Sequence, residues 1–185
     1  MSEQHTSVNT QCDTCFVGQY GDLCCMKCNA KSVQHITLDT LPTAQLRPRH
    51  GTIRLKNGNV LHTTYKSDSQ KAHESTLEAF LKPYAPKSPI NAPVVLFFVA
   101  HMQTPMTTPK KRLEAMLGGK ICHTKKPDLD NIAKQLKDAM TRLRFWQDDK
   151  QVVGLLCFKQ FSQKSRWEIE LITLDAESYD AGKRR

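Results

Sequence analysis

Two acidic clusters in the second half of the chain carry side chains suited to metal-dependent chemistry. The first lies in Lys126-Pro-Asp-Leu-Asp-Asn131, where Asp128 and Asp130 stand two residues apart, and the second is Asp148-Asp149. Carboxylate oxygens are hard ligands that suit Mg²⁺ or Mn²⁺. A metal held by such oxygens polarises a phosphate and lowers the pKa of a bound water. If the two clusters meet in space, we expect a site for phosphodiester hydrolysis.

A lysine accompanies the first cluster. Lys134 follows Asp130 by one helical turn and Asp138 follows by another, so all three share one face of a predicted helix. An ammonium group there would offset the charge that grows on phosphorus during cleavage. With Arg142, however, these residues alternate in sign every four positions, which is also typical of an ordinary solvated salt-bridge ladder. The ladder leaves the other three aspartates unexplained, and both interpretations are open from the sequence.

The charge balance of the whole chain points to a polyanionic partner. The 185 residues include 27 Lys and Arg against 18 Asp and Glu, a net charge of +9. Such a balance favours nucleic acid, although a basic surface also serves solubility. Basic groups that contact phosphates add affinity without reading the base sequence. The predicted DNA-contacting residues are Lys110, Lys111, Arg112, Lys125 and Lys126, with Arg47 and Arg49, for which a plain surface loop is the alternative.

The hydrophobic pattern predicts the elements that must position these residues. A hydrophobic share of 39% supports a packed core in one main domain. We expect strands at 33–38, 52–55, 60–64, 94–100, 152–158 and 166–174, and helices at 68–81, 109–117 and 132–143. Asn57-Gly58-Asn59 predicts a hairpin turn, and residues 162–165 are expected to join the last two strands as a second hairpin. Asp130 is expected to cap the helix at 132–143, and the apolar strands 94–100 and 152–158 are expected to be buried.

Five of the seven cysteines fall within residues 12–28. Cys12-x-x-Cys15 and Cys25-x-x-Cys28 form two knuckles that would supply the four ligands of a structural Zn²⁺, with Cys24 as an alternative ligand. A disordered or redox-active leader is the other interpretation. We therefore divide the chain into a Cys-rich N-terminal extension (1–30), a main domain (31–176) and a charged C-terminal tail (177–185).

The N-terminus and the hydropathy pattern bear on the expected compartment. The first ten residues lack the apolar core of a signal peptide, and no apolar run approaches the roughly 20 residues of a membrane helix. We expect a cytoplasmic protein without a membrane partner.

Residues 126–152 resemble a known family. Lys126-Pro-Asp-Leu-Asp-Asn131, Lys134, Asp138-Ala139 and Trp146-Gln-Asp-Asp-Lys-Gln-Val152 are similar in type and spacing to the signature of the RusA family of Holliday-junction resolvases. Arg47-Pro-Arg49, His62-Thr-Thr-Tyr65 and the Pro109–Arg112 stretch with Gly118-Gly119 also resemble phage-type members. The resemblance spans residues 33–175, and the Cys-rich extension departs from it.

The resemblance carries expectations about fold, partners and roles. It implies a small α/β (α+β) domain in which helices pack on a mixed sheet, and a bacterial or phage-encoded homodimer that cleaves four-way DNA junctions with Mg²⁺ and no small-molecule cofactor. The family's catalytic positions fall on Asp128, Asp130, Lys134 and Asp149. The three aspartates among them would bind the metal, with Asp148 as a neighbouring candidate ligand. Asn131 would orient a carboxylate or a water, and Asp138 would be structural.

We therefore predict a structure-selective endodeoxyribonuclease that resolves Holliday junctions in DNA recombination and repair, with Mg²⁺ and with Mn²⁺ as a possible substitute. A two-fold dimer would present two active sites to the two equivalent scissile bonds of a junction. The first alternative is a non-catalytic, zinc-containing DNA-binding protein. The second is a metal phosphoesterase that acts on nucleotides.

Overall fold

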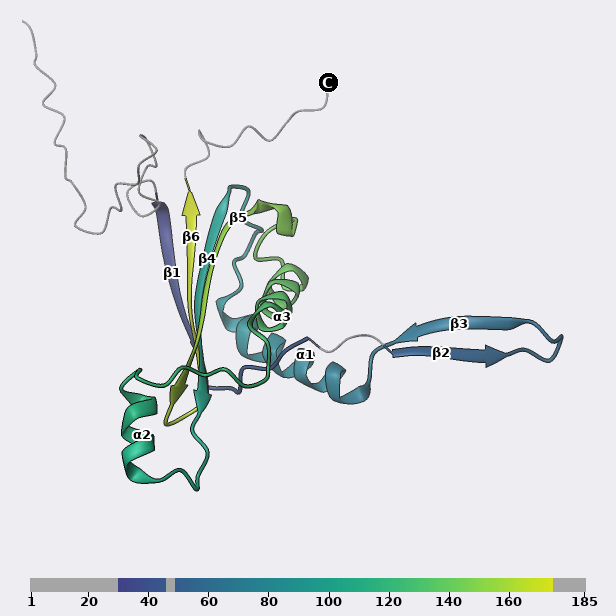
Figure 1. The fold of residues 1–185 in the computed structure, drawn as a ribbon. Coiled ribbons are helices and arrows are strands. Elements are labelled where there is room, and N and C mark those ends of the chain that lie inside the picture. Colours follow the sequence, from purple (N-terminus) through teal and green to yellow (C-terminus); the bar gives the residue numbers. More distant parts are fainter. Residues whose placement is uncertain (1–29, 46–48, 175–185) are drawn as a thin grey trace, which may run out of the picture.

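The computed structural model describes residues 30–45 and 49–174 (Figure 1). Along the chain these residues form β1 (Ala30–Leu38), β2 (Arg49–Arg54), β3 (Val60–Tyr65), α1 (Asp68–Leu81), η1 (Lys82–Tyr84), β4 (Val94–Gln103), α2 (Lys110–Leu117), α3 (Leu129–Arg142), η2 (Asp149–Gln151), β5 (Val152–Ser162) and β6 (Arg166–Leu174). Helices and strands share one core, which confirms the predicted α+β fold class.

A four-stranded mixed sheet forms the body of the molecule. Its strand order is β1-β6-β4-β5, with β4 antiparallel to β6 and parallel to β5. The central strand β4 alternates between two environments, because Leu96, Phe98 and Ala100 lie in the main core while Phe97 and Val99 face the other side and are half-buried. Helices α1 and α3 cover the core side, and α2 packs near one end of the sheet (Figure 1).

The two covering helices follow from their apolar spacing. In α1 the hydroxyl of Ser67 accepts a hydrogen bond from the Gln70 backbone N–H, and Leu77 and Leu81 are buried. In α3 a regular apolar stripe faces the sheet; its buried hydrophobic members are Ile132, Ala133, Leu136, Ala139 and Met140. The expected bounds of α1 are confirmed, whereas α3 starts three residues earlier than expected. Asp128 therefore occupies the cap position predicted for Asp130.

The last two strands correct a second expectation. β5 and β6 do not form a hairpin, because β4 lies between them and pairs with both. The three residues 163–165 cross the end of β4, and a short extended segment is long enough to span two inter-strand spacings of about 4.8 Å. As a result β5 is an edge strand, and the predicted burial of 152–158 is wrong for a single chain: Val153, Leu156 and Phe158 are 55%, 47% and 54% exposed.

Several predictions concern residues that the structure does not describe. The zinc ligands Cys12, Cys15, Cys25 and Cys28, the arginine Arg47 and the tail 177–185 lie outside the described residues. The zinc site and the domain division accordingly stay predictions. Within the described part of the chain, no helix is both long and apolar enough to span a membrane.

Candidate active site

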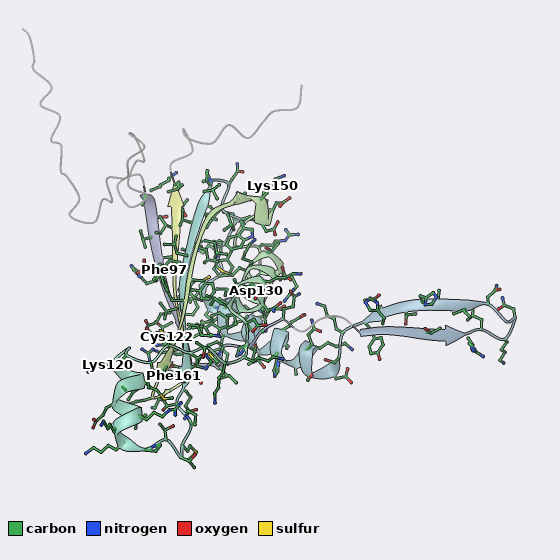
Figure 2. All side chains as sticks on the ribbon, viewed as in Figure 1. Phe97, Lys120, Cys122, Asp130, Lys150 and Phe161 are labelled. Atoms are coloured by element: carbon green, nitrogen blue, oxygen red, sulfur yellow. The ribbon has the colours of Figure 1, made fainter. Side chains whose placement is uncertain are left out.

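The first acidic cluster lies at the start of α3, where both of its carboxylates face solvent. Asp128 is the N-cap residue in extended conformation, yet its side chain caps no backbone N–H. Asp130 lies in the first turn (Figure 2). Both residues are exposed, and neither carboxylate makes a hydrogen bond or ion pair with residues 30–45 or 49–174. An aspartate at a helix start usually caps it, so two uncommitted carboxylates here are free to bind something else.

The salt-bridge ladder proposed as an alternative does not form. Asp138 instead accepts a hydrogen bond of 2.8 Å from Gln45 Nε2, and Arg142 pairs with Glu74 and Glu78 of α1. Lys134 is exposed and has no ion-pair partner among the described residues. The last two members of the supposed ladder, Asp138 and Arg142, are therefore structural. Asp130 and Lys134 remain available on one face of α3.

The second acidic cluster lies further along the same helix. The Asp149 carboxylate is 3.6 Å from Lys137 Nζ and is 59% exposed. Lys137 follows Asp130 by two helical turns, so this ion pair places Asp149 beside the helix that carries the first cluster. Within residues 30–45 and 49–174, no three His, Cys, Asp or Glu side chains are grouped closely enough to hold a metal ion. The two clusters thus lie beside the same helix but are not gathered into one metal site.

Asp148 differs from its neighbour because its carboxylate is already used. It accepts a hydrogen bond of 3.0 Å from the Lys150 backbone N–H, and Gln151 returns the contact by accepting from the Asp148 N–H. The hydrogen bond from Lys150 N–H, aided by the charge of the Lys150 ammonium, lowers the pKa of Asp148. This side chain caps η2 and fixes the backbone from which Asp149 projects.

A cleft opens beside the first cluster. It has a volume of about 500 Å³, and Lys126, Pro127, Asp128 and Asn131 form one of its walls. Residues 41–45, His73 and Met102 form the rest. The backbone of Gln45 is tied to the helix start through a hydrogen bond to the Asn131 carbonyl. Asp128 therefore lines an open cleft whose far wall is tied to the helix start.

The predicted basic residues are all exposed where their side chains are described. Lys125 and Lys126 lie three and two residues before Asp128, so the chain itself brings them to the site. Lys110, Lys111 and Arg112 form the first turn of α2, at the end of the sheet, with no acidic residue in that turn. Backbone N–H groups at a helix start also favour anions. Arg49 lies in β2, on an element separate from α3.

The backbone segment that leads into Asp128 is held by a residue that sequence reasoning missed. The ammonium of Lys159, on β5, donates to the carbonyl oxygens of Lys125 and Pro127 at 2.7 Å each. The same segment is held a second time where the His123 ring packs on Phe161, with ring centroids 4.7 Å apart. Burial, together with the charges of Lys159 and Lys125, lowers the pKa of His123 and keeps it neutral at neutral pH. The only sequence signal was a lysine interrupting an apolar strand.

Gln151 performs the corresponding task for the second cluster. Its buried amide donates to the carbonyls of Ile90 and Ala92 and accepts from the backbone N–H groups of Gln147 and Asp148. Four hydrogen bonds from one side chain join η2 to the start of β4. The glutamine of the Asp148-Asp149-Lys-Gln151 motif thus sets the position of the aspartates, a role that residue types and spacing alone could not reveal.

Comparison with known proteins identifies the family. The family described as Endodeoxyribonuclease RusA matches residues 39–172. An uncharacterised protein, YqaN of Bacillus subtilis (strain 168), is 33% identical over 138 residues, which cover 73% of this chain and 92% of that protein. The crossover junction endodeoxyribonuclease rusA of Lactococcus phage r1t is 50% identical over 48 residues, 26% of this chain and 37% of the phage protein. The chain belongs to the RusA endodeoxyribonuclease family.

Proposed function

We propose that this protein is a Mg²⁺-dependent endonuclease that resolves Holliday junctions during DNA recombination and repair. The observation that carries the proposal is the uncommitted group Asp128, Asp130 and Lys134 at the start of α3, in a chain of the RusA family. Carboxylates placed only for stability would cap the helix or pair with Lys134, and these do neither. The phage relative is named as a crossover junction endodeoxyribonuclease, which supports the four-way junction as substrate.

The donor set at the helix start fits a magnesium ion. Mg²⁺ in nucleotide-processing sites is commonly bound through one or two carboxylates, with waters and substrate phosphates filling the other positions. Asp128 and Asp130 would supply the two carboxylates. We propose Asp149 as the third ligand, although its carboxylate is not grouped with the other two. Metal binding would have to break its exposed ion pair with Lys137, which is worth at most about 1 kcal/mol, and draw the carboxylate toward Asp130. Asp148 is assigned a capping role and not a ligand role, since its carboxylate is occupied in η2.

When bound, the metal would polarise the scissile phosphate and lower the pKa of a water nucleophile. The side chains contribute the remaining steps. Lys134 places its ammonium one turn from Asp130, where it offsets the charge that develops on the phosphate oxygens. Lys125 and Lys126 bind the flanking phosphates beside the cleft, and Lys110, Lys111 and Arg112 extend the basic surface onto α2.

Cleavage of a synthetic four-way junction tests the proposal. With Mg²⁺ the wild-type protein is expected to cut two strands symmetrically near the crossover, whereas with excess EDTA it should bind the junction and leave it intact. A linear duplex of the same sequences serves as the substrate control. Binding without cleavage at any Mg²⁺ or Mn²⁺ concentration would instead favour a non-catalytic DNA-binding protein, and hydrolysis confined to free nucleotides would favour a phosphoesterase.

We further propose that the homodimer forms through the sheet face that α1 and α3 leave uncovered (Figure 1). On this face Phe97 and Val99 of β4 lie beside Leu156 and Phe158 of β5, with the Phe97 and Phe158 rings 6.0 Å apart. Exposed apolar patches of this kind mark protein interfaces. The neighbouring side chains of β6 on the face include Glu168 and Glu170, which disfavours DNA as the occupant and suits a second protein surface.

Substituting Phe158 by glutamate tests this interface. The charge would have to be buried in the dimer, so we expect the dimer dissociation constant to rise at least about 100-fold in sedimentation equilibrium. Phe80→Glu is the matched control, because Phe80 is 41% exposed on α1 and lies away from the sheet face. A Phe158→Glu protein that dimerises like the wild type would show that another surface makes the contact.

A further inference from the structure

The β2–β3 hairpin projects away from the body of the molecule (Figure 1). Among residues 30–45 and 49–174, its two strands pair only with each other. The Leu55 and Asn59 backbones close the turn around Gly58, which has a positive φ of 82°. Ile53, Leu61 and Tyr65 are 50%, 49% and 51% exposed although they share one face of the ribbon. A two-stranded hairpin without a core is marginally stable in water, so this element is shaped to contact a partner.

The charge of the hairpin selects the kind of partner. Residues 47–65 contain Arg47, Arg49, Arg54 and Lys56 and no acidic residue. In the described part, Arg54 and Lys56 are exposed and make no ion pair with residues 30–45 or 49–174. The ribbon face opposite Ile53 carries the cationic and hydrogen-bonding side chains of Arg54, His62 and Thr52, with Val60 beside Arg54. Phosphate groups complement such a face, whereas an apolar or basic protein surface does not.

The dimensions of the hairpin match duplex DNA. Two strands lie about 4.8 Å apart, and the major groove of B-DNA, about 12 Å wide, admits a two-stranded ribbon. Strands of six residues extend about 20 Å, the length of roughly six base pairs at 3.4 Å per pair. Apolar side chains on one face can contact thymine methyl groups in that groove while the basic face meets phosphates.

The root of the hairpin is fixed to the helices that build the site. Lys66, directly after β3, donates to both carboxylate oxygens of Glu74 at 3.0 and 2.8 Å, and Gln70 donates to the same group. Glu74 also lies 3.8 Å from Arg142 of α3. Although burial opposes ionisation, these partners lower the pKa of Glu74 and keep it charged. The arm is therefore held in a set direction relative to α3.

We propose that the β2–β3 hairpin is a DNA-binding arm that lies in the major groove of a duplex arm next to the crossover. The proposal rests on the proposed function, since it takes junction DNA as the ligand. It adds a contact remote from the cleavage site, which would fix the orientation of a junction arm relative to α3.

The test compares the full chain with an Arg54→Gln/Lys56→Gln variant on a four-way junction in EDTA. We expect roughly tenfold weaker binding at low salt, and a slope of log K against log salt that is smaller in magnitude by about 2, because two phosphate contacts are lost. Hydroxyl-radical footprinting should lose protection in one duplex arm and retain it at the crossover. Lys82→Gln/Lys87→Gln removes the same charge from exposed positions near η1 and should change neither result.

Three outcomes would contradict the proposal that the hairpin binds DNA. The hairpin variant could keep the wild-type affinity and footprint, or the control variant could lose as much affinity as the hairpin variant. The hairpin variant could also change its oligomeric state while its DNA binding is unchanged. The last outcome would assign the hairpin to a second protein chain. Because EDTA removes cleavage from the assay, the result is independent of catalysis. If the protein binds DNA through the hairpin but never cuts it with Mg²⁺, the proposed nuclease function is wrong and the proposed role of the hairpin is retained.

Discussion

Substituting Asp130 by asparagine is expected to abolish junction cleavage while junction binding persists. Asparagine keeps the size of the side chain and removes the charge that a divalent metal requires. We expect single-turnover cleavage to fall by on the order of 10³-fold or more, as it does when a principal electrostatic contact to the transition state is lost. Binding measured in EDTA should be unchanged or slightly tighter, since a negative charge near the DNA backbone has gone.

Asp138→Asn is the matched control for this substitution. It makes the same chemical change on the same helix two turns later, but the asparagine oxygen can still accept the hydrogen bond from Gln45. We expect cleavage by this variant to stay within a few-fold of the wild type. Wild-type cutting by the Asp130→Asn protein would show that the uncommitted carboxylates at the start of α3 are not the catalytic group.

The fold could be predicted from the sequence where the cause is local. The apolar spacing of α1 and the Asn57-Gly58-Asn59 turn depend on neighbouring residues, and both were predicted correctly. The order of strands depends on distant pairing, and there the local signal was misleading. The turn-forming residues 162–165 predicted a hairpin of the last two strands, yet β4 lies between β5 and β6. The apolar run of β5 predicted burial. That prediction was wrong for a single chain, because an apolar sequence does not say whether its own chain or a partner covers the strand.

In the candidate site, too, local features could be predicted from the sequence and features that depend on distant contacts could not. Helical spacing was sufficient to place Asp130 and Lys134 on one face, and it could not decide between a metal site and a salt-bridge ladder. That decision depends on Gln45, Glu74 and Glu78, which engage Asp138 and Arg142 from distant parts of the chain. The pairing of Asp149 with Lys137 was likewise not predictable, because it follows from how η2 packs on α3.

The second large effect is expected at Lys159, which acts on the site through the backbone. Its ammonium joins two carbonyl oxygens of the segment that leads into Asp128. Lys159→Met keeps the length of the side chain and removes both hydrogen bonds. We expect the maximal rate of single-turnover cleavage to fall about 10- to 100-fold, since a small displacement of a reacting group is costly. The Mg²⁺ concentration for half-maximal rate should rise, because Asp128 would be less well placed.

Two further measurements separate positioning from a general loss of stability or charge. Lys164→Met removes an exposed lysine from the β5–β6 connection and should leave the rate and the Mg²⁺ dependence as in the wild type. Lys159→Arg retains donors at the same place and should restore part of the rate. If Lys159→Met lowers junction affinity and leaves the cleavage rate of the bound junction and its Mg²⁺ dependence unchanged, then Lys159 contributes as a phosphate contact and the anchoring of the Asp128 segment has no catalytic role.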